Sequence, residues 1–191
     1  LPDMQTVEAY IPASGRWPLN SETWDLHNGD VDTFKRHFWN RNKPMWEAFA
    51  PCADIEAAVE VSQFAQAWGA KVLVEHCRAR WPETGGMLWW KLNDCWPCMD
   101  GGLYDYELRP RMIVRAMRAA AAPTLLCVGQ PLHKDILELR LINHSDDPIS
   151  GTFALEAWPL GAAGPQDGVV LNAEGMPWAT SILGILPLTK S

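Results

Sequence analysis

Apolar residues recur at spacings of three and four along the segment 54–80, the longest periodic run in the chain. The positions that share one helical face are Ala58, Val61, Ala65, Trp68 and Val72. Asp54 is a suitable N-cap, and the proline and glycines that follow position 80 end the run. This pattern predicts an amphipathic helix with one buried stripe. Because Gly69 weakens its middle, we expect one bent helix or two shorter ones.

Three shorter segments have weaker helical patterns. Residues 2–11 and 110–121 each begin with a proline that suits a first helical turn, and a second proline follows each of them. A less regular run covers residues 34–41. The intervening residues 12–31 are loop-like, and a loop of that length inside a compact domain is usually functional or flexible. Its candidate site residues are Trp24 and His27.

Residues 85–97 form a short apolar run between two glycines and a polar turn. A strand that is apolar on both faces is typical of the centre of a sheet covered by helices. In such sheets and barrels, ligands bind at the C-terminal ends of the strands. The sequence therefore predicts a buried strand that delivers tryptophan side chains and the pair Asn93 and Asp94 to a site.

After Pro123 the period changes from helical spacing to alternation. Residues 135–143 place Leu137, Leu139 and Leu141 on one face, and residues 151–158 alternate again. This predicts a half-buried antiparallel sheet, and an immunoglobulin-like sandwich is the module we expect. About 70 residues remain for this domain, whereas such domains usually have near 100 residues. Both a partial domain and a short complete one therefore stay open.

The predicted fold class is thus α/β followed by all-β. The predicted domains are residues 1–122 and residues 123–191.

Composition and charge narrow the partners. The chain has 191 residues, a net charge of −7 and 11 tryptophans. The negative charge argues against nucleic acid or an anionic membrane as partner, because both bind clustered Lys and Arg. No apolar run reaches a membrane span and no leader pattern is present, so the sequence predicts a soluble chain without indicating its compartment. Tryptophan faces stack well on sugar rings, although most of the 11 are expected to fill the core.

Five cysteines, an odd number, exclude a complete internal disulfide framework. Cys95 and Cys98 form a Cys-x-x-Cys motif, so a thiol-disulfide oxidoreductase is one alternative. In that class a helix starts at the motif, whereas here Met99-Asp100-Gly101-Gly102 follows, which does not sustain a helix. No second cysteine pair has zinc-ligand spacing, so we expect no metal and no cofactor.

The segment Gly86-x-Leu-x-Trp-x-Leu-Asn-Asp-Cys-Trp-Pro97 resembles the eighth barrel strand of glycoside hydrolase family 2, in its β-mannosidase branch. Its neighbours agree with this resemblance. Residues 62–78 are similar to the helix before that strand, and residues 105–111 are similar to the loop and start of the last barrel helix. Residues 1–3 resemble the segment after the family's Ser-Glu-Phe-Gly motif. The resemblance covers roughly residues 1 to 160, and residues 86–97 are its specific part.

The resemblance implies the terminal portion of a TIM (β/α)8 barrel followed by an immunoglobulin-like domain, and a retaining exo-β-glycosidase that cuts β-mannosides or a related sugar. Retaining enzymes use two carboxylates about 5 Å apart, one as nucleophile and one as general acid/base. In the family both are glutamates on strands four and seven. By the resemblance we expect both to precede Leu1, so no catalytic residue is assigned to this chain.

What remains is one wall of a sugar-binding subsite. By the resemblance, Trp90 is the expected platform for the sugar ring, and Lys91 stands where the family usually has Gln. Asn93 and Asp94 are expected either to hydrogen-bond sugar hydroxyls or to shape the loop. The remaining candidate contacts are Trp96, Trp24 and His27, of which Trp96 is expected mainly to pack.

Two hypotheses of function follow. In the first, the chain is part of a β-mannosidase-like glycosidase, with a carbohydrate substrate and the remainder of a parent chain as its partners. In the second, it is a non-catalytic module that binds carbohydrate or has a structural role. A single barrel strand leaves its edges unpaired, so we expect the chain to pack against more protein.

Overall fold

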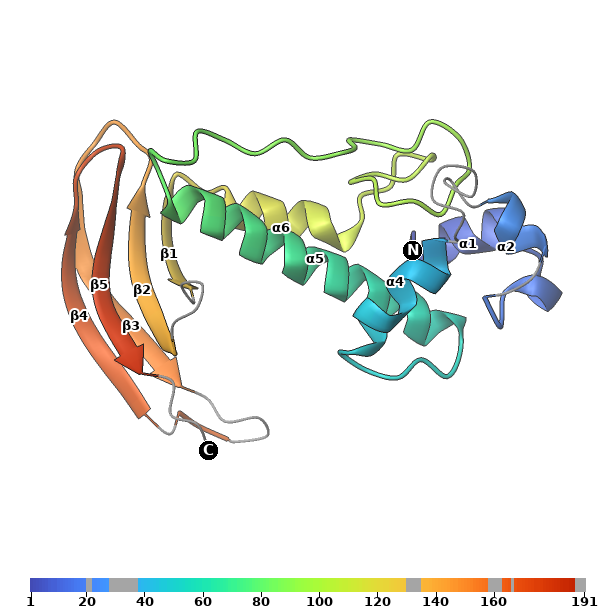
Figure 1. Ribbon diagram of the computed structural model, residues 1–191, viewed down its shortest axis with the longest axis horizontal. Helices are drawn as coiled ribbons and strands as arrows, with labels where there is room; N and C mark the ends of the chain where they lie inside the picture. The colour runs from blue at the N-terminus through green and yellow to red at the C-terminus, as the bar shows by residue number, and fades with distance from the viewer. Residues whose placement is uncertain (20–21, 28–37, 130–134, 158–162, 166, 188–191) are drawn as a thin grey trace. The chain divides into compact units, whose positions relative to one another are not determined.

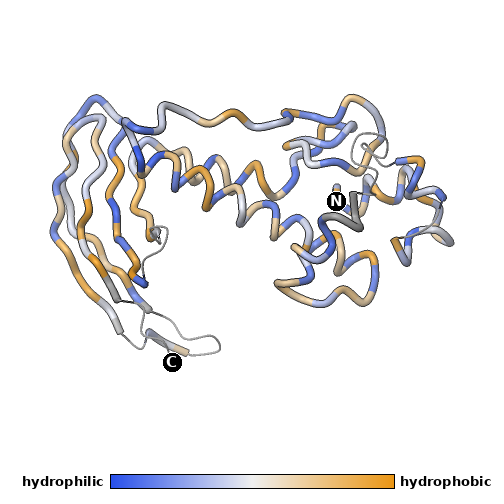
Figure 2. The backbone as a smooth tube through the Cα atoms, viewed as in Figure 1, coloured by the Kyte–Doolittle hydropathy of each residue, from blue (hydrophilic) through white to orange (hydrophobic). Residues whose placement is uncertain are grey.

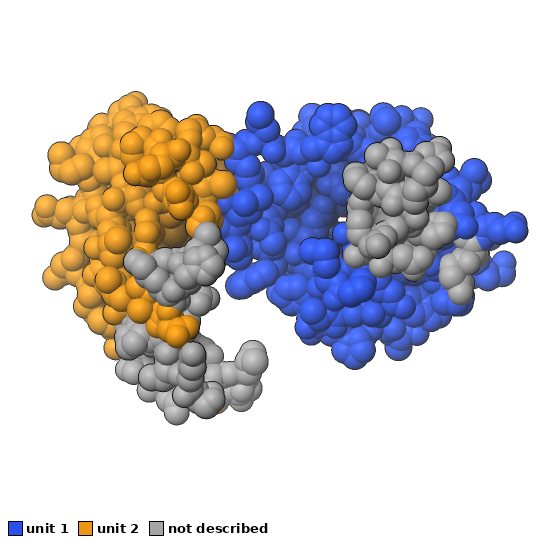
Figure 3. Space-filling model, in the orientation of Figure 1, with its two compact units in different colours: residues 1–73, 87–120 blue, residues 74–86, 121–191 orange. Residues whose placement is uncertain are grey.

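The structure is a computed structural model that describes residues 1–19, 22–27, 38–129, 135–157, 163–165 and 167–187 (Figure 1). The chain divides into two compact units, shown in separate colours in Figure 3. Unit 1 contains residues 1–73 and 87–120, and unit 2 contains residues 74–86 and 121–191.

Unit 1 is built mainly from helices. Its described helical elements are α1 (Met4–Tyr10), the 3-10 turn η1 (Ala13–Gly15), α2 (Glu22–Leu26), α4 (Phe38–Glu47), most of α5 (Ile55–Ala79) and α6 (Met112–Ala120). Their apolar faces meet in a core that includes Val7, Ile11, Trp24, Trp46 and Met99. The helices predicted over 2–11 and 110–121 are confirmed as α1 and α6.

The long helix α5 is confirmed as a single element. The Asp54 carboxylate accepts a hydrogen bond from the backbone N–H of Ala57 at 2.9 Å, which is the expected N-cap. The helix continues through Gly69, where an added Cβ would meet no atom within 4 Å.

The expected buried stripe of α5 is confirmed only in its first half, where Ala58 is fully buried and Val61 and Ala65 pack partly buried against the core. Trp68 and Val72 are each 49% exposed, whereas Val59, Ala67 and Ala70 are buried. The apolar pattern contains two overlapping faces, and only one of them faces the core of the unit.

Two predictions in the first 50 residues need correction. Residues 12–31 were expected to be irregular, but they contain α2 within their described part. The predicted run over 34–41 is observed as α4, which continues through Pro44 to Glu47. The remaining residues of these two predictions, 20–21 and 28–37, lie outside the described part of the chain.

The predicted strand over residues 85–97 is wrong as regular structure. The segment has no regular secondary structure. The only β-bridge described for it is an isolated parallel bridge between Asn93 and Tyr104. Leu88 is fully exposed and Leu92 is 64% exposed. A central strand requires hydrogen-bonding neighbours on both sides, and among the described residues only those around position 104 pair with it.

Unit 2 is a β-rich unit. Its described strands are β1 (Thr124–Gly129), β2 (Ile136–Asn143), β3 (Ile149–Ala157), β4 (Asp167–Gly175) and β5 (Ala179–Pro187). They form two antiparallel sheets, one with the order β1-β2-β5 and one with β3-β4. Figure 2 shows both hydrophobic and hydrophilic stretches along these strands. Strict alternation holds in β2 between Leu137 and Leu141, whereas β1 is apolar from Leu125 to Val128. The observed pairing confirms the antiparallel sheet predicted after Pro123, while β1 and β5 were not predicted.

The polar face of β2 is covered. Glu138 is 5% exposed although the alternation placed it opposite the leucines. Its carboxylate accepts hydrogen bonds from the guanidinium of Arg140, which also donates to the backbone oxygen of Ala79 at 2.7 Å. A paired and hydrogen-bonded charge can be buried at much lower cost than an isolated one.

Candidate functional site

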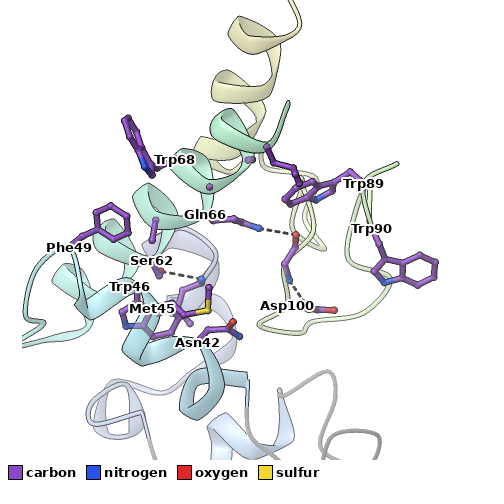
Figure 4. A pocket seen from close by; sticks show the side chains of 16 residues that line it. Asn42, Met45, Trp46, Phe49, Ser62, Gln66, Trp68, Trp89, Trp90 and Asp100 are labelled. Atoms are coloured by element: carbon purple, nitrogen blue, oxygen red, sulfur yellow. Dashed lines mark hydrogen bonds between the residues drawn. The ribbon is translucent and has the colours of Figure 1, made fainter. Parts of the chain in front are cut away.

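A pocket of about 790 Å³ opens in unit 1 between helices and the segment that follows residue 88 (Figure 4). Helix α4 contributes Met45 and Trp46, and α5 contributes residues from Ser62 to Leu73. The opposite wall is formed by Trp89, Trp90, Asp100 and Gly101. The lining is therefore largely aromatic and apolar with a few polar groups, which is the usual character of a ligand pocket.

Trp90 is the most accessible aromatic ring of this pocket. It is 88% exposed, and in Figure 4 its ring extends away from the helical wall. The peptide bond between Trp90 and Lys91 is cis. Trp89, the preceding residue, is half-buried, so the two rings present different surfaces of one segment.

A network of four charged side chains lies beside these tryptophans. The Lys91 ammonium is 3.1 Å from the Asp100 carboxylate and 3.3 Å from the Asp94 carboxylate. Arg111, at the start of α6, pairs with the other oxygen of Asp94 at 2.6 Å and donates to the Gly102 carbonyl at 2.6 Å. Two cations thus balance two anions, and the network joins residues 91–94, Asp100 and the start of α6.

The network shifts the pKa of two of its members. Burial acts to raise the pKa of Asp100, but the hydrogen bond from the Gly101 N–H and the neighbouring Lys91 ammonium outweigh it, so the pKa is lowered. Burial acts to lower the pKa of Lys91, but the hydrogen bond to Asp100 and the nearby negative groups raise it overall. Both side chains are therefore charged near neutral pH.

Asp94 is placed where it shapes the segment. Its side chain is fully buried and pairs with Arg111. Its backbone N–H donates to the backbone carbonyl oxygen of Tyr104 at 3.1 Å. The Asn93 side-chain amide donates to the Asp94 backbone oxygen at 3.0 Å. The sequence left open whether these two residues bind sugar hydroxyls or shape the loop. The contacts favour loop shaping for Asp94, and the NH2 group of Asn93 also bonds to the loop backbone.

His27 and Trp96, which are far apart in the sequence, lie side by side. Their rings stack with centroids 6.4 Å apart and an interplanar angle of 17°, and Tyr10 stacks with His27 at 5.7 Å. His27 Nδ1 is 2.5 Å from the Pro97 carbonyl oxygen. Because that oxygen only accepts, Nδ1 carries the proton in this contact, and in the neutral ring Nε2 is then the acceptor nitrogen.

Trp24 does not reach the pocket. It is fully buried in the core of unit 1, and its indole N–H donates to the Gly15 carbonyl at 2.9 Å. The irregular loop expected around it would have allowed exposure, whereas α2 turns the ring inward. Trp24 therefore belongs to the core of unit 1.

Sequence reasoning missed several pocket residues. Trp46 is 4% exposed, and the buried indole N–H groups of Trp46 and Trp89 have no hydrogen-bond partner among the described residues. Gln66 donates to the Gly101 carbonyl at 2.9 Å and so fixes the far wall to α5 (Figure 4). The glutamine was seen only as part of a helix, and no local pattern indicated that it reaches residue 101.

The Cys-x-x-Cys motif lacks the properties of a redox site. Cys98 is 2% exposed, and burial, followed by the charge of Asp94, raises the pKa of its thiol to about 12. Thiol-disulfide chemistry needs a thiolate, which burial beside carboxylates disfavours. Cys95 is exposed and both cysteines are free. The structure thus gives the oxidoreductase alternative no support.

Asp94, Cys98 and Asp100 also bring three possible metal-ligand atoms within 4.8 Å of one another. The Lys91 ammonium contacts both carboxylates of this group. A positive charge is therefore already supplied by the chain, and the cluster is explained as part of the ion network.

Comparison with known proteins shows sequence similarity to β-mannosidases. The chain is 28% identical over 135 residues to "Beta-mannosidase B" of Aspergillus flavus, a match that covers 69% of this chain and 16% of the relative. The corresponding protein of Aspergillus terreus is 27% identical over 157 residues, covering 81% of this chain and 18% of the relative. The chain thus spans less than a fifth of the length of the curated relatives it matches. No family model matches the chain.

Solved structures agree at the level of the fold. The β-D-mannosidase of Dictyoglomus thermophilum matches with a TM-score of 0.81 and 19% identity, covering 100% of this chain and 23% of that one. The exo-chitosanase CsxA of Amycolatopsis orientalis matches with a TM-score of 0.80 and 19% identity, covering 98% of this chain and 22% of that one.

No helix among the described residues is long and apolar enough to cross a membrane.

Proposed function

The chain resembles the β-mannosidase-like branch of glycoside hydrolase family 2, and on that premise we propose that it forms part of a retaining exo-β-glycosidase and supplies one wall of its sugar-binding subsite. The longer protein of which we take it to be a part is called the parent chain below. Unit 1 corresponds in this proposal to the terminal portion of a TIM barrel, and unit 2 to an immunoglobulin-like domain.

The observation that carries the proposal is the presentation of Trp90. Its ring is 88% exposed, and the segment just after it is held by the ion pairs of Lys91 and Asp94. An indole face offers a large apolar surface to the C–H face of a sugar at little conformational cost, because its backbone is already fixed. The exposed indole of Trp90 is thus a ready platform for a terminal sugar ring.

His27 and Trp96 extend this wall in the proposal. Their stacking and the His27 contact with Pro97 fix the imidazole orientation. The acceptor nitrogen Nε2 is then suited to receive a hydrogen bond from a sugar hydroxyl. Asn93 completes the wall through the part of its amide that does not bond to the backbone, while Asp94 holds the segment from behind.

The chemistry itself requires groups from the parent chain. Retaining glycosidases need two carboxylates about 5 Å apart, and the pocket described here is lined by a single carboxylate, Asp100, which pairs with Lys91. We propose that both catalytic glutamates belong to the remainder of the parent chain. This chain then binds and orients the sugar, and the remainder cleaves it.

The remainder of the parent chain is also the partner we propose for the exposed face of α5. Phe64 and Trp68 on this helix, with Phe49 before it, are each between 44% and 49% exposed. Phe64 stacks on Trp68 and meets Phe49 edge to face. Contiguous aromatic exposure of this kind is typical of a surface that is covered by further protein.

Kinetics of the parent chain test the role of Trp90. We expect Trp90→Ala to raise KM for an aryl β-mannoside by about tenfold, which corresponds to about 1.4 kcal/mol of lost binding, without changing thermal stability. Tyr106→Ala is the matched control and should leave KM unchanged, since Tyr106 is a 45% exposed aromatic residue of the same unit that does not line the pocket. Equal KM values for the Trp90 variant and the unsubstituted enzyme would contradict the proposal. The isolated 191-residue chain should not hydrolyse this substrate.

The non-catalytic alternative predicts a different result. A binding module should bind manno-oligosaccharides by itself, with a change of tryptophan fluorescence on titration. Binding by the isolated chain together with an inactive parent chain would favour that alternative over the glycosidase.

A further inference from the structure

Unit 2 carries a second cluster of aromatic side chains, none of which lines the pocket. Trp81, His144 and Trp178 are in mutual ring contact: His144 lies 5.8 Å from each tryptophan, and the two tryptophans lie 6.5 Å apart. Trp81 follows α5, His144 follows β2 and Trp178 precedes β5. All three residues belong to unit 2, so their arrangement is set within one unit.

The two tryptophans of this cluster are accessible. Trp178 is 53% exposed and Trp81 is 37% exposed. Their planes are tilted by 49°, so they form an angled surface instead of one flat stack. Two large, half-exposed indoles on a small β unit are unusual, because tryptophan is mostly buried when it serves only to pack.

Trp178 is also held in place by several independent restraints. Its ring stacks on His144 with an interplanar angle of 17°, and its indole N–H donates to the Asp146 carboxylate at 2.9 Å. Its backbone has a φ of 52°, in the left-handed region that a bulky residue rarely adopts. Such strained positions occur most often where function requires a fixed side chain. The ring is therefore preorganised while much of its surface remains open.

From this cluster we propose a second carbohydrate-binding surface on unit 2, at which the indoles of Trp81 and Trp178 stack on the rings of a neutral oligosaccharide or polysaccharide. Angled aromatic faces fit successive sugar rings, whose mean planes rotate along a chain. Asp146, an exposed carboxylate beside Trp178, is placed to accept hydrogen bonds from sugar hydroxyls.

The charges near the cluster favour a neutral ligand over an anionic one. Asp146 and Asp147 are both exposed in the adjoining turn, and the whole chain carries a net charge of −7. An anionic polymer would be repelled by these groups. A neutral polyhydroxylated ligand can use both the apolar faces and the carboxylates.

This inference concerns binding outside the pocket and stands independently of the proposed catalytic role. The choice of galactomannan and glucomannan as probes, and the use of the surface to bring a polymer to the pocket, rest on that role. The function of such a surface would be to hold a polymer near the enzyme while an exposed chain end enters the pocket.

The test is affinity gel electrophoresis of the parent chain in gels containing galactomannan, glucomannan or mixed-linkage β-glucan. We expect at least one polymer to retard the protein, and Trp178→Ala and Trp81→Ala each to weaken this binding at least fivefold. Met176→Ala is the matched control, since Met176 is 68% exposed in the same turn but has no ring. It should change binding less than twofold.

Two further measurements separate the possible failures. Trp178→Phe keeps an aromatic face and should retain part of the binding, and unchanged hydrolysis of a small aryl glycoside by all variants would show that the fold and the pocket are intact. If no polymer retards the parent chain, or if the tryptophan variants bind as well as the control, the proposal is overturned. It is also overturned if N-bromosuccinimide fails to oxidise Trp178, because the surface is then covered by other protein. An inactive parent chain would count against the proposed function alone.

Discussion

Arg111 and Asp94 form a buried ion pair: Nη2 of the guanidinium lies 2.6 Å from Oδ2 of the carboxylate, and the two side chains are 2% and 0% exposed. The pair joins the first turn of α6 to the segment that carries Trp90. The sequence resemblance included Arg111 only as a feature of a helix start, whereas the structure shows that its guanidinium binds both Asp94 and the Gly102 carbonyl.

Removal of one partner of this pair should be strongly destabilising. Arg111→Met leaves the Asp94 carboxylate buried without its main counter-charge, which typically costs about 3–5 kcal/mol. Arg118→Met is the control, since Arg118 is an exposed residue on the same helix. Hydrogen exchange of α6 and of residues 89–101 in the parent chain measures the effect. A difference of less than about 1 kcal/mol between the two variants would contradict this account.

Gly102 is required by close packing against the same pair. A Cβ at this position would lie 2.8 Å from Asp94 Oδ1 and 2.9 Å from the Tyr104 backbone oxygen. We therefore expect Gly102→Ala to lower the free energy of unfolding by about 1–3 kcal/mol. Gly69→Ala provides the opposite case, because its Cβ meets nothing within 4 Å inside α5. It should stabilise by about 0.5–1 kcal/mol. Chemical denaturation of both variants checks the two signs, and a stable Gly102 variant would show that this loop can relax.

The helices and strands that local periodicity specifies were predictable from the sequence. α5 and α6 have apolar spacings and end signals within their own segments, and the alternation of β2 and β3 is equally local. The segment 85–97 has a strand-like composition, but a strand also needs partners, which the described part of the chain supplies at one bridge only. Composition alone therefore predicted regular structure where hydrogen bonding does not provide it.

The candidate site could be predicted only in part. Trp90 and the residues after it were found because they are contiguous in the sequence. The pairing of Lys91 with Asp100, and the contact of His27 with Trp96, depend on how distant segments fold together, and no spacing rule contains that information. The inward orientation of Trp24 depends on α2, which was not predicted.

The ion pair between Lys91 and Asp100 predicts a specific pH dependence. The pKa of Asp100 is lowered below its ordinary value of 3.8, so its contribution to stability is present above that value. The contribution is lost as the pH falls through the lower, folded-state pKa. The pKa of Lys91 is raised above 10.5, so its contribution is full below that value and is lost as the pH rises through the higher, folded-state pKa.

The variant Asp100→Asn tests the acidic side of this window. The stability difference between the unsubstituted protein and the variant should be constant from pH 5 to pH 8 and should shrink as the pH falls below about 3.8. Denaturant unfolding at a series of pH values measures it. Glu60→Gln, at an exposed position of α5, is the control and should show no such convergence. A difference that grows on acidification would have the wrong sign and would rule out the ion pair as its cause.

Alkylation of the two cysteines of the Cys-x-x-Cys motif tests whether the motif is structural. We expect iodoacetamide at pH 8 to modify Cys95, which is exposed, and to leave Cys98 unmodified in the folded protein. Cys98 is 2% exposed, and burial and nearby carboxylates raise its thiol pKa to about 12, so almost no thiolate exists at that pH. Modification of Cys98 after unfolding in urea is the positive control. Equal modification rates for the two cysteines in the folded protein would contradict this expectation, because a thiol-disulfide mechanism requires a reactive thiolate and a reachable partner at this motif.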